Sequence, residues 1–473
     1  MFEYCTAELF SQDNSYYAFD GEKFIIWKND QAMYETLLYI KENHSIPSGT
    51  SRQIMTQIMQ KVNAGLFFLK EKPAYPIRTL EAKTLVVSFP IVHGCNLRCR
   101  YCYAKSGDVY SGKHRVLSME ILDGIIEFIK TNYNDISIIR LEFVSGGETL
   151  LNPDLFFTLV NHFKEKLTEC GYQVHIMLLT NGTKLTEEIL SRIVALDCAL
   201  ALSLDGPKEV QDYQRPFQNG EGTYERVLES IHMLQKLSNF HNNYWVVSVI
   251  SAKTPDLWEV LCHNKELGIT SMEMRVMRGN EPKELALNQE NLAAFISLYE
   301  KFAEKLIEKP NDVLMILNEY DTFGKLLKRI LLKKGAPRRC PAGDKKFSFT
   351  ADGDIYPCDS FVGREAFVLG NVIDHSWNDS LAKEFQSLNF VSGREIKPCS
   401  NCSIRYMCGS DCHYNSYVCT GTIWNKESVF CQLQKKLFHI AVDLLETIKE
   451  KHPKEYQYIY RVAKMQDQIN EET

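Results

Sequence analysis

Short apolar segments alternate with longer amphipathic segments between residues 83 and 280, and this alternation constrains the fold more than any other feature of the chain. In the amphipathic segments, apolar residues such as Ile121, Ile125 and Ile129 recur on one face of a helix. The expected strands are residues 85–89, 138–144, 174–180, 199–204, 244–250 and 271–277, and the expected helices are residues 118–133, 153–170, 187–195, 224–237 and 257–267. Such repeats with right-handed crossovers predict an α/β fold, a partial (β/α)6 barrel whose functional residues collect at the C-terminal ends of the strands.

A small α+β module is expected ahead of the barrel. The turn pair Asp20-Gly21 separates two aromatic segments, and Asp30 can cap the helix that follows. The expected elements are a hairpin over residues 16–27, helices over residues 33–40 and 54–62, and a strand over residues 66–69. This order is typical of a winged-helix-like module. The alternative is an N-terminal extension that packs on the main domain.

Composition and charge limit the class of protein. The chain has 473 residues, 45% of them hydrophobic and 24% charged, which predicts a soluble globular protein of two or three domains. We expect a cytoplasmic protein, because the sequence has neither an apolar run of membrane-spanning length nor a secretory signal. A net charge of −6 disfavours non-specific nucleic-acid binding. In such a chain, fifteen cysteines indicate metal or redox chemistry rather than disulfides.

The C-terminal third differs from the barrel region in composition and in periodicity. A Lys-rich helical linker is expected at residues 316–338, and the segment from 339 to 432 is rich in Cys, Gly, Asp and Pro and poor in periodic elements. Such a segment needs something other than a large core to hold it together. An amphipathic helix over residues 433–448 and a frayed polar tail complete the chain. We therefore expect divisions at residues 1–80, 83–315, 316–338, 339–432 and 433–473.

Three cysteines with the spacing CxxxCxxC follow the first expected barrel strand. Cys95, Cys99 and Cys102 would lie on a loop at the barrel mouth, where three thiolates suit a [4Fe–4S] cluster whose fourth iron is open to an outside ligand. The alternative, structural zinc, needs four ligands, and His93 is too close to Cys95 to be a good fourth ligand.

With its neighbours, this motif resembles that of the radical S-adenosylmethionine (SAM) superfamily, which implies a TIM-like partial barrel, a SAM-binding [4Fe–4S] cluster and SAM itself. Ser145-Gly146-Gly147-Glu148 is similar to the GGE motif that binds the SAM amino group; its glycines admit a ligand to the backbone and Glu148 can pair with an ammonium group. The resemblance further implies that Ser203 faces the ribose and that Arg215 meets the SAM carboxylate. The remaining residues implied in SAM binding are Tyr101, Asn181 and Asp205.

The second group of cysteines resembles that of the SPASM domain, which carries two auxiliary [4Fe–4S] clusters in radical SAM enzymes that act on peptides and proteins. The resemblance implies an outer cluster held by Cys399, Cys402, Cys408 and Cys431, and an inner cluster held by Cys340, Cys358 and Cys412. A zinc ribbon is the alternative. Residues 341–348 contain no further cysteine, so either Cys419 completes the inner set or one iron is open to a substrate thiolate.

Asp359 follows Cys358 directly. In anaerobic sulfatase maturases an aspartate in this position is the proposed base, which implies a catalytic role for Asp359; the alternative is a turn residue with a solvated carboxylate. The four cysteines outside both motifs are expected to be buried apolar side chains. They are Cys5, Cys170, Cys198 and Cys262.

Residues 95–112 resemble maturases of the sactipeptide and ranthipeptide type, which install thioether crosslinks in ribosomally made peptides (RiPPs). That resemblance implies a radical SAM oxidoreductase, a precursor peptide with a leader sequence and a flavodoxin- or ferredoxin-type electron donor. Residues 1–80 would bind the leader as an added strand. A maturase that forms carbon–carbon crosslinks and an anaerobic sulfatase maturase that makes formylglycine are the alternatives.

Overall fold

The computed structural model describes residues 2–70, 83–144, 146–237, 243–279, 282–336, 340–388 and 398–472. The chain divides into two compact units. The first unit contains Met1–Arg78, Asn288–Arg339 and Phe390–Glu472, and the second contains Thr79–Leu287 and Cys340–Asn389. Each unit is therefore discontinuous in sequence, and the two are described separately.

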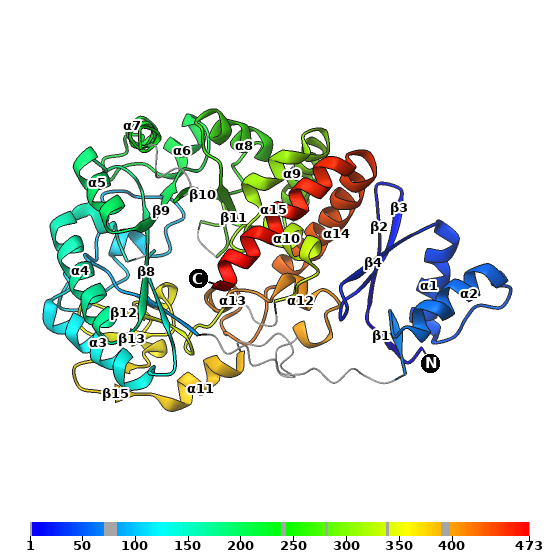
Figure 1. Ribbon diagram of the computed structural model, residues 1–473, viewed down its shortest axis with the longest axis horizontal. Coiled ribbons are helices and arrows are strands. Elements are labelled where there is room, and N and C mark those ends of the chain that lie inside the picture. Colours follow the sequence, from blue (N-terminus) through cyan, green and yellow to red (C-terminus); the bar gives the residue numbers. More distant parts are fainter. Residues whose placement is uncertain are drawn as a thin grey trace. The chain divides into compact units, whose positions relative to one another are not determined.

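The second unit is built on a largely parallel sheet with helices between its strands (Figure 1). The parallel strands, in chain order across the sheet, are β6 Thr84–Ser88, β7 Ile138–Phe143, β8 Gln173–Thr180, β9 Cys198–Ser203, β10 Tyr244–Ile250 and β11 Met272–Val276. The predicted helices are α3 Met119–Asn132, α4 Pro153–Glu169, α5 Glu187–Ala195, α7 Tyr224–Gln235 and α8 Leu257–Glu266. All of these predictions are confirmed to within about two residues at each end. The short helix α6 Lys208–Gln214 was not predicted.

The two faces of this sheet have different chemistry. Because side chains alternate along a strand, Ile139, Leu141 and Phe143 of β7 share a buried face, and the Phe143 ring packs against Phe156 of α4 with centroids 5.1 Å apart. Arg140 and Glu142 lie on the opposite face. The helix-covered face is therefore apolar, and the other face carries polar and charged side chains.

The first part of the Cys-rich region continues this sheet. Strand β12 Lys346–Phe349 pairs in parallel with β6, and β13 Asp354–Tyr356, β14 Gly370–Asn371 and β15 Ser376–Trp377 follow as antiparallel neighbours. Helix α11 Asp379–Leu388 ends this part. Strands of two to four residues give almost no periodic signal, which is why the sequence indicated a segment poor in regular structure.

The N-terminal part of the first unit contains the predicted module. Its elements are β1 Tyr4–Cys5, β2 Ala7–Gln12, β3 Ser15–Asp20, β4 Ile25–Asn29, α1 Gln31–Asn43, α2 Arg52–Asn63 and β5 Phe68–Leu69. The hairpin β3–β4, both helices and the last strand are confirmed; β1 and β2 were not predicted. Asp30 caps α1 as expected, since its carboxylate accepts a hydrogen bond of 2.8 Å from the Met33 N–H. The three strands β2-β3-β4 form one antiparallel sheet, and β1 pairs with β5.

This three-stranded sheet is covered on both faces. Ala18 of β3 belongs to the apolar core formed with α1 and α2, whereas its neighbours on the opposite face pack against α14 Ser428–Lys451. The Phe19 and Phe438 rings lie 4.7 Å apart, and the Tyr17 hydroxyl donates a buried 2.7 Å hydrogen bond to Asp443. The N-terminal module therefore shares a core with the C-terminal helix, in addition to having the predicted element order.

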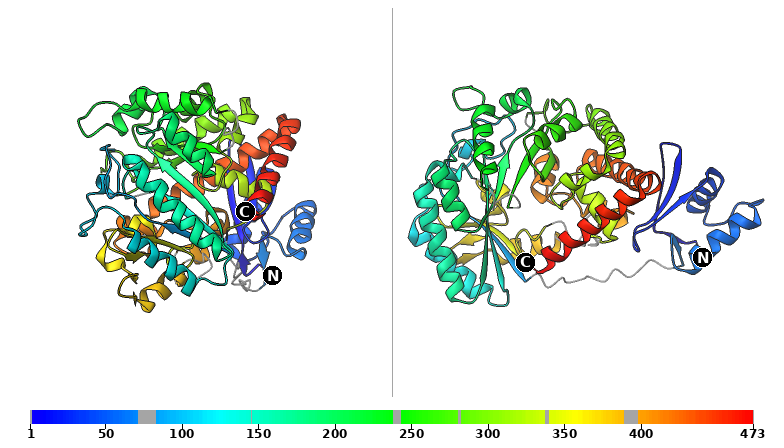
Figure 2. Two further views of the ribbon diagram at one scale, coloured as in Figure 1. Left: turned by 60° about the vertical axis from the view of Figure 1, so that its left-hand side comes forward. Right: turned by 45° about the horizontal axis from the view of Figure 1, so that its top comes forward.

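The remaining helices of the first unit are α9 Leu292–Glu308, α10 Gly324–Leu332, α12 Arg405–Cys408, α13 His413–Thr420 and α15 Pro453–Glu472, with the 3-10 helix η3 Pro310–Ile316 between α9 and α10. Figure 2 shows α14 and α15 as consecutive helices at the C-terminal end of the chain. The expectation of a frayed tail is wrong, because α15 extends to Glu472. Buried Ile459 and Ala463 hold this helix, and Asp467 pairs with Lys334 at 2.8 Å.

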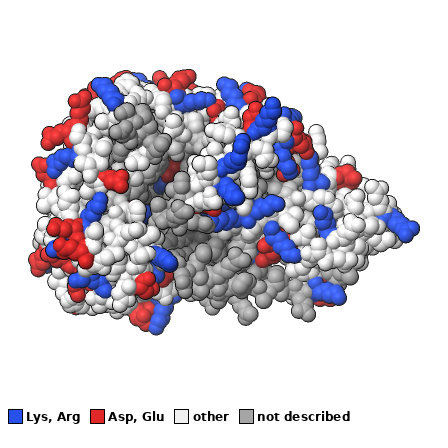
Figure 3. Space-filling view, in the orientation of Figure 1, with Lys and Arg blue, Asp and Glu red and all other residues white. Residues whose placement is uncertain are grey.

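Acidic and basic side chains are interspersed on the face of the molecule in Figure 3. Among the described residues, no helix is long and apolar enough to cross a membrane.

Candidate functional site

The loop after β6 brings the first three cysteines together. The Cys99 thiol has its pKa raised to about 12, chiefly by burial and also by the nearby sulfurs of Cys102 and Cys95, while Arg215 acts in the opposite direction. Burial likewise raises the pKa of Cys95 to about 11. The Leu97 N–H donates to the Cys95 sulfur at 3.4 Å. Clustered thiols that meet backbone donors are the arrangement that an iron–sulfur cluster requires.

Two backbone hydrogen bonds fix this loop to the segment that follows α6. The Arg98 N–H donates to the Pro216 carbonyl and the Arg100 N–H to the Gln214 carbonyl, both at 2.9 Å. The loop is therefore anchored next to Arg215, at the C-terminal end of the parallel strands.

Tyr101, Asp205 and Arg215 form one buried network beside the cysteines. The Tyr101 hydroxyl donates to Asp205 at 2.6 Å and accepts from the Arg215 guanidinium at 2.6 Å. Asp205, which is fully buried, also accepts from the Val249 N–H and from Gln214. Burial raises the pKa of Asp205, and Arg215 and the hydrogen bonds oppose that shift.

Arg215 retains an unused hydrogen-bond donor in this network. Its Nε is buried and has no partner among the described residues. The Asp205 carboxylate and the Cys99 sulfur both lie close enough to raise the pKa of Arg215, even though burial alone would lower it. An unsatisfied cationic donor beside the cysteine loop fits an anionic ligand group such as a carboxylate.

The glycines of residues 146–148 permit a close backbone approach. Gly147 has φ +158°, and a Cβ there would come within 2.1 Å of the Gly94 carbonyl oxygen, so no other residue fits. The Glu148 N–H donates to that same oxygen at 2.7 Å. This contact joins the end of β7 to the cysteine loop. Ser145 lies outside the described residues.

Glu148 is buried and already holds three hydrogen bonds. Its carboxylate accepts from the Thr180 hydroxyl at 2.7 Å, the Asn181 N–H at 2.8 Å and the Leu150 N–H at 3.1 Å. Burial raises the pKa of Glu148, and these donors oppose that shift. Glu148 therefore joins the ends of β7 and β8.

Asn181 connects this group to the cysteines. Its side-chain amide donates to Asn96 at 3.0 Å and approaches the Cys95 sulfur at 3.7 Å. Ser203 is buried at the end of β9. The structure thus places Asn181 beside Cys95 and brings Tyr101, Asp205 and Arg215 together. It places Gly146, Gly147, Glu148 and Ser203 at strand ends of the same sheet.

Asp359 begins the 3-10 helix η4 Asp359–Phe361, and two residues separate it from the end of β13. The side chain is only 12% exposed; it accepts a 3.0 Å hydrogen bond from the Tyr103 hydroxyl and lies 3.5 Å from the Lys346 ammonium. The alternative of a solvated turn carboxylate is therefore wrong. Lys346 also contacts Glu142 at 3.0 Å, and these carboxylates hold the pKa of Lys346 above its usual value although burial alone would lower it.

Lys346 and Glu142 were not predicted as site residues. A signal was present for Glu142, because charged residues alternate with apolar ones in Ile138–Phe143 and therefore share one face of β7. Nothing in the sequence pairs that face with Lys346, since the two strands are about 200 residues apart.

The second group of cysteines is divided between the two units. In the second unit, Cys358 follows β13 and lies near Lys346, while the Gly343 N–H donates to the Pro357 carbonyl at 3.1 Å and so brings the turn after Cys340 against the same segment. Cys412 belongs to the first unit, where it caps α13 seven residues before Cys419. The inner ligand set stays a prediction.

The four outer cysteines lie close together in the first unit. Burial, together with the nearby sulfurs of Cys408, Cys399 and Cys402, raises the pKa of Cys431 to about 12. Cys402 is affected in the same way, with a pKa of about 11. The four sulfurs are therefore neighbours in space, and their role as cluster ligands stays a prediction.

Other cysteines differ in their exposure. Cys198 is buried as expected, but Cys5 and Cys262 are half-buried, and Cys170 is exposed because it ends α4 where the chain turns into solvent. In the described part of the chain, no three Cys, His, Asp or Glu side chains converge as the ligands of a single metal ion do. A four-iron cluster binds each cysteine through a different iron, so its ligand sulfurs stand further apart.

Comparisons with known proteins agree with this geometry. Residues 89–256 match the Radical SAM superfamily, and residues 340–403 match the SPASM iron–sulfur cluster-binding domain. The serine-type anaerobic sulfatase-maturating enzyme of Bacteroides thetaiotaomicron is 26% identical over 363 residues, 71% of this chain and 84% of that protein. The cysteine-type enzyme of Clostridium novyi is 25% identical over 371 residues, 75% of this chain and 94% of that protein.

A solved structure has the same fold. Native anSMEcpe with bound AdoMet and the Cp18Cys peptide covers 78% of this chain and 99% of its own, with a TM-score of 0.63 and 21% identity. The family matches support a SAM-binding [4Fe–4S] cluster, SAM and auxiliary iron–sulfur clusters in this protein. The chain is a radical SAM enzyme with a C-terminal SPASM domain, related to the anaerobic sulfatase maturases.

Proposed function

We propose that this enzyme installs thioether crosslinks, from a cysteine sulfur to a carbon, in a ribosomally made precursor peptide. The observation that carries the proposal is the N-terminal α+β module, whose sheet shares a core with the helix bearing Cys431. A module for reading a leader sequence is expected of a precursor-peptide maturase, whereas a sulfatase maturase has no need of one.

The proposed ligands are those that the resemblance to radical SAM and SPASM proteins implies. Cys95, Cys99 and Cys102 would hold the SAM-binding cluster, and the unsatisfied Nε of Arg215 would meet the SAM carboxylate. Tyr101 and Asp205 would orient that guanidinium. The residues proposed to line the rest of the SAM site are Ser145, Gly146, Gly147, Glu148, Asn181 and Ser203. Two auxiliary clusters would be held by Cys340, Cys358 and Cys412 and by Cys399, Cys402, Cys408 and Cys431.

When bound, the cluster and SAM supply a 5′-deoxyadenosyl radical that removes a hydrogen atom from an unactivated carbon. For each thioether the carbon loses that hydrogen atom, the cysteine loses its proton and one electron leaves the peptide. Asp359 would accept the proton, because its carboxylate is held by Tyr103 and Lys346 in a largely buried position.

The leader would add as a strand to β4. Among the described residues, β4 pairs with a strand on one side only, so its other edge has room for an added strand, although the Trp27 carbonyl already accepts a hydrogen bond from the Asn29 side chain. Trp27 of β4 packs on Phe67, and the Lys61 ammonium lies 5.3 Å from the Trp27 ring centre. These contacts anchor the strand to the rest of the module.

The first test is a mass assay on anaerobically reconstituted enzyme with SAM, a reductant and the Cys-containing precursor peptides encoded beside its gene. Loss of two hydrogens per crosslink with a cysteine that no longer alkylates is expected. The same loss with an alkylatable cysteine would instead indicate a carbon–carbon link. Formation of 5′-deoxyadenosine without any change in these peptides would favour a sulfatase-type reaction.

Leader binding is better tested by point variants than by removing residues 1–80, because such a deletion would uncover Phe438 on α14. Successive backbone N–H groups of a strand point to opposite edges, so proline at Ile26 and proline at Trp27 test the two edges of β4. The variant whose proline replaces an N–H bonded to β3 should be less stable than the wild type. The other should keep its thermal midpoint but bind a fluorescent leader peptide at least tenfold more weakly; unchanged binding by both folded variants would contradict leader addition at β4.

The sulfatase-type reaction is the second candidate, and the Asp359 environment favours it. A carboxylate positioned by a tyrosine and a lysine directly after Cys358 suits removal of a proton from a cysteine or serine side chain. Formylglycine formation on a Cys- or Ser-containing sulfatase peptide would establish it.

A further inference from the structure

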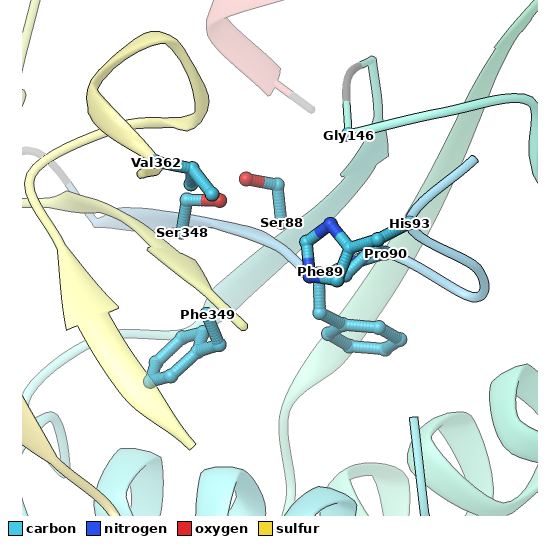
Figure 4. A pocket seen from close by; sticks show the side chains of 8 residues that line it. All are labelled: Ser88, Phe89, Pro90, His93, Gly146, Ser348, Phe349 and Val362. Atoms are coloured by element: carbon cyan, nitrogen blue, oxygen red, sulfur yellow. The ribbon is translucent and has the colours of Figure 1, made fainter. Parts of the chain in front are cut away.

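A small pocket opens on the polar side of the barrel sheet, and none of the residues of the Arg215 network lines it. Its walls come from the ends of β6 and β12, the cysteine loop, the glycine-rich turn after β7 and the segment after η4 (Figure 4). The lining residues are Ser88, Phe89, Pro90, His93, Gly146, Ser348, Phe349 and Val362. There is room for about one water-sized group.

Several polar atoms in this pocket have no partner. Ser88 and His93 are each at least 97% buried, and the Ser88 hydroxyl has no hydrogen-bond partner among the described residues. The ring nitrogens of His93 have no partner of good geometry there, although the Gly146 backbone lies close enough to influence the ring. Ser88 and Ser348 are direct neighbours on adjacent strands, and Figure 4 shows their hydroxyls turned toward each other. A buried polar atom without a partner destabilises the protein, so a ligand that forms the missing hydrogen bonds binds more tightly.

The ring and the backbone of His93 are both held in place. The His93 ring stacks on Tyr110, with centroids 3.6 Å apart, and the Tyr110 hydroxyl donates a 2.6 Å hydrogen bond to Asp352. The His93 N–H donates to the Arg115 carbonyl at 2.7 Å, which fixes the backbone as well. The imidazole therefore does not turn away to find another partner.

The lining excludes charged ligands and large ones. None of the eight residues is Asp, Glu, Lys or Arg, so the lining itself offers no ion-pair partner to a carboxylate or ammonium group. The hydroxyl and imidazole groups both donate and accept hydrogen bonds. A small neutral group with the same capacity, a thiol or a hydroxyl, fits the size and the chemistry.

The position of the pocket connects it to the chemistry. His93 precedes Cys95 by two residues, Gly146 belongs to the glycine-rich turn, and Val362 follows Asp359 within the same short segment. The pocket thus lies between the loop of the first cysteines and the segment that carries Cys358 and Asp359, all within the second unit.

We propose that this pocket binds the thiol or hydroxyl of a cysteine, serine or threonine side chain of the peptide substrate and so selects the residue that reacts. The inference rests on the proposed function, in that it requires a peptide substrate. Ser88 and His93 are then specificity-determining residues that touch the peptide, and a side chain lacking the polar group leaves both unsatisfied.

The test is a double-mutant cycle between enzyme and peptide. The enzyme variants are Ser88→Ala and His93→Phe, of which the second retains a ring to stack on Tyr110; Ser137→Ala, on the exposed end before β7, is the matched control. The peptides are the precursor peptides encoded beside the gene, with each Cys, Ser and Thr changed in turn to Ala, and Cys also changed to Ser. Iron content, absorption spectrum and thermal midpoint establish that each variant is folded and loaded.

Two readouts separate binding from turnover. The first is the dissociation constant of fluorescein-labelled peptide on cluster-loaded enzyme with SAM but without reductant, and the second is the ratio of 5′-deoxyadenosine formed to peptide modified. One Ala-substituted peptide should bind the wild-type enzyme at least tenfold more weakly, and Ser88→Ala and His93→Phe should each remove most of that difference. Both variants should also form more 5′-deoxyadenosine per modified peptide. Comparison of the Cys and Ser peptides distinguishes a thiol from a hydroxyl.

The inference would be overturned if enzyme and peptide substitutions had additive effects on binding in every cycle and both variants kept the wild-type ratio of 5′-deoxyadenosine to modified peptide. The pocket would then hold only a water molecule, and the proposal of peptide maturation would stand. A wild-type enzyme that cleaves SAM but binds and modifies none of the peptides would overturn the proposed function and the assignment of the pocket with it.

Discussion

Replacing Tyr101 by phenylalanine should weaken both the fold and SAM binding. The Tyr101 hydroxyl lies between the Asp205 carboxylate and the Arg215 guanidinium, with hydrogen bonds of 2.6 Å to each. A hydrogen bond to a charged group contributes roughly 1.5–3 kcal/mol, and Asp205 keeps its donors from Val249 and Gln214. We therefore expect the free energy of unfolding of the cluster-free protein to fall by about 2–4 kcal/mol.

The same substitution frees the guanidinium that is proposed to meet the SAM carboxylate. A loss of about 1.4 kcal/mol in binding corresponds to a tenfold larger dissociation constant, which is the minimum expected here. The assays are urea unfolding of the cluster-free protein and anaerobic equilibrium binding of SAM to the loaded protein. Tyr213→Phe is the control, because Tyr213 is exposed and lies two residues from Arg215. A Tyr101→Phe protein that matches this control in both assays would refute the reasoning.

Three further substitutions test other parts of the structure. Lys346→Met should lower the free energy of unfolding by about 3–5 kcal/mol, because it leaves the carboxylates of Asp359 and Glu142 without their shared cation. The control Lys345→Met should lower it by under 1 kcal/mol in the same urea unfolding assay, and equal losses would argue against the buried ion pair. Burial would raise the pKa of Glu8, but hydrogen bonds from His439 and Ser403 lower it from 4.5 to about 2. Ionised Glu8 therefore contributes about 3 kcal/mol to the free energy of unfolding above pH 4.5, and this contribution is lost as the pH falls through 2. Glu8→Gln should flatten the dependence of stability on pH between 5 and 2, and parallel curves for mutant and wild type would rule this out. Phe438→Ala should destabilise the first unit by about 3–5 kcal/mol, measured by calorimetry. The control Met465→Ala, on the exposed side of α15, should cost less than about 0.5 kcal/mol. A small loss for Phe438→Ala would show that the sheet β2-β3-β4 does not depend on α14.

Local pattern was sufficient for the barrel and for the cysteine motifs. The strands and helices from β6 to α8 are long enough to carry a clear period, and their ends follow from it. The resemblance to the SPASM domain implied the outer set; the structure brings its four sulfurs near one another, and their role as ligands stays a prediction. These are features in which neighbours in sequence are also neighbours in space.

Features that depend on pairing between distant segments were not predictable. Strand β2 was missed because both of its faces are covered, so Phe10 and Leu9 break the expected alternation of apolar and polar residues. The environment of Asp359 depends on β12 pairing with β6, which places Lys346 on the same face as Glu142. The pairing of Ser88 with Ser348 arises from the same register, and no local pattern reveals it.

The core shared by the N-terminal sheet and α14 also has a consequence for synthesis of the protein. Strands β2 to β4 leave the ribosome before the barrel, but the helix that covers their second face, with Phe438 and Asp443, leaves after it. The barrel segments are synthesised between the sheet and α14, so Phe10 and Phe19 stay uncovered on the sheet during that time. Cys431 arrives on that same late helix, so the outer cysteine set and the N-terminal sheet become complete together. A nascent or C-terminally truncated chain would therefore lack both, and would expose an apolar surface for chaperones or for other unfinished chains to bind.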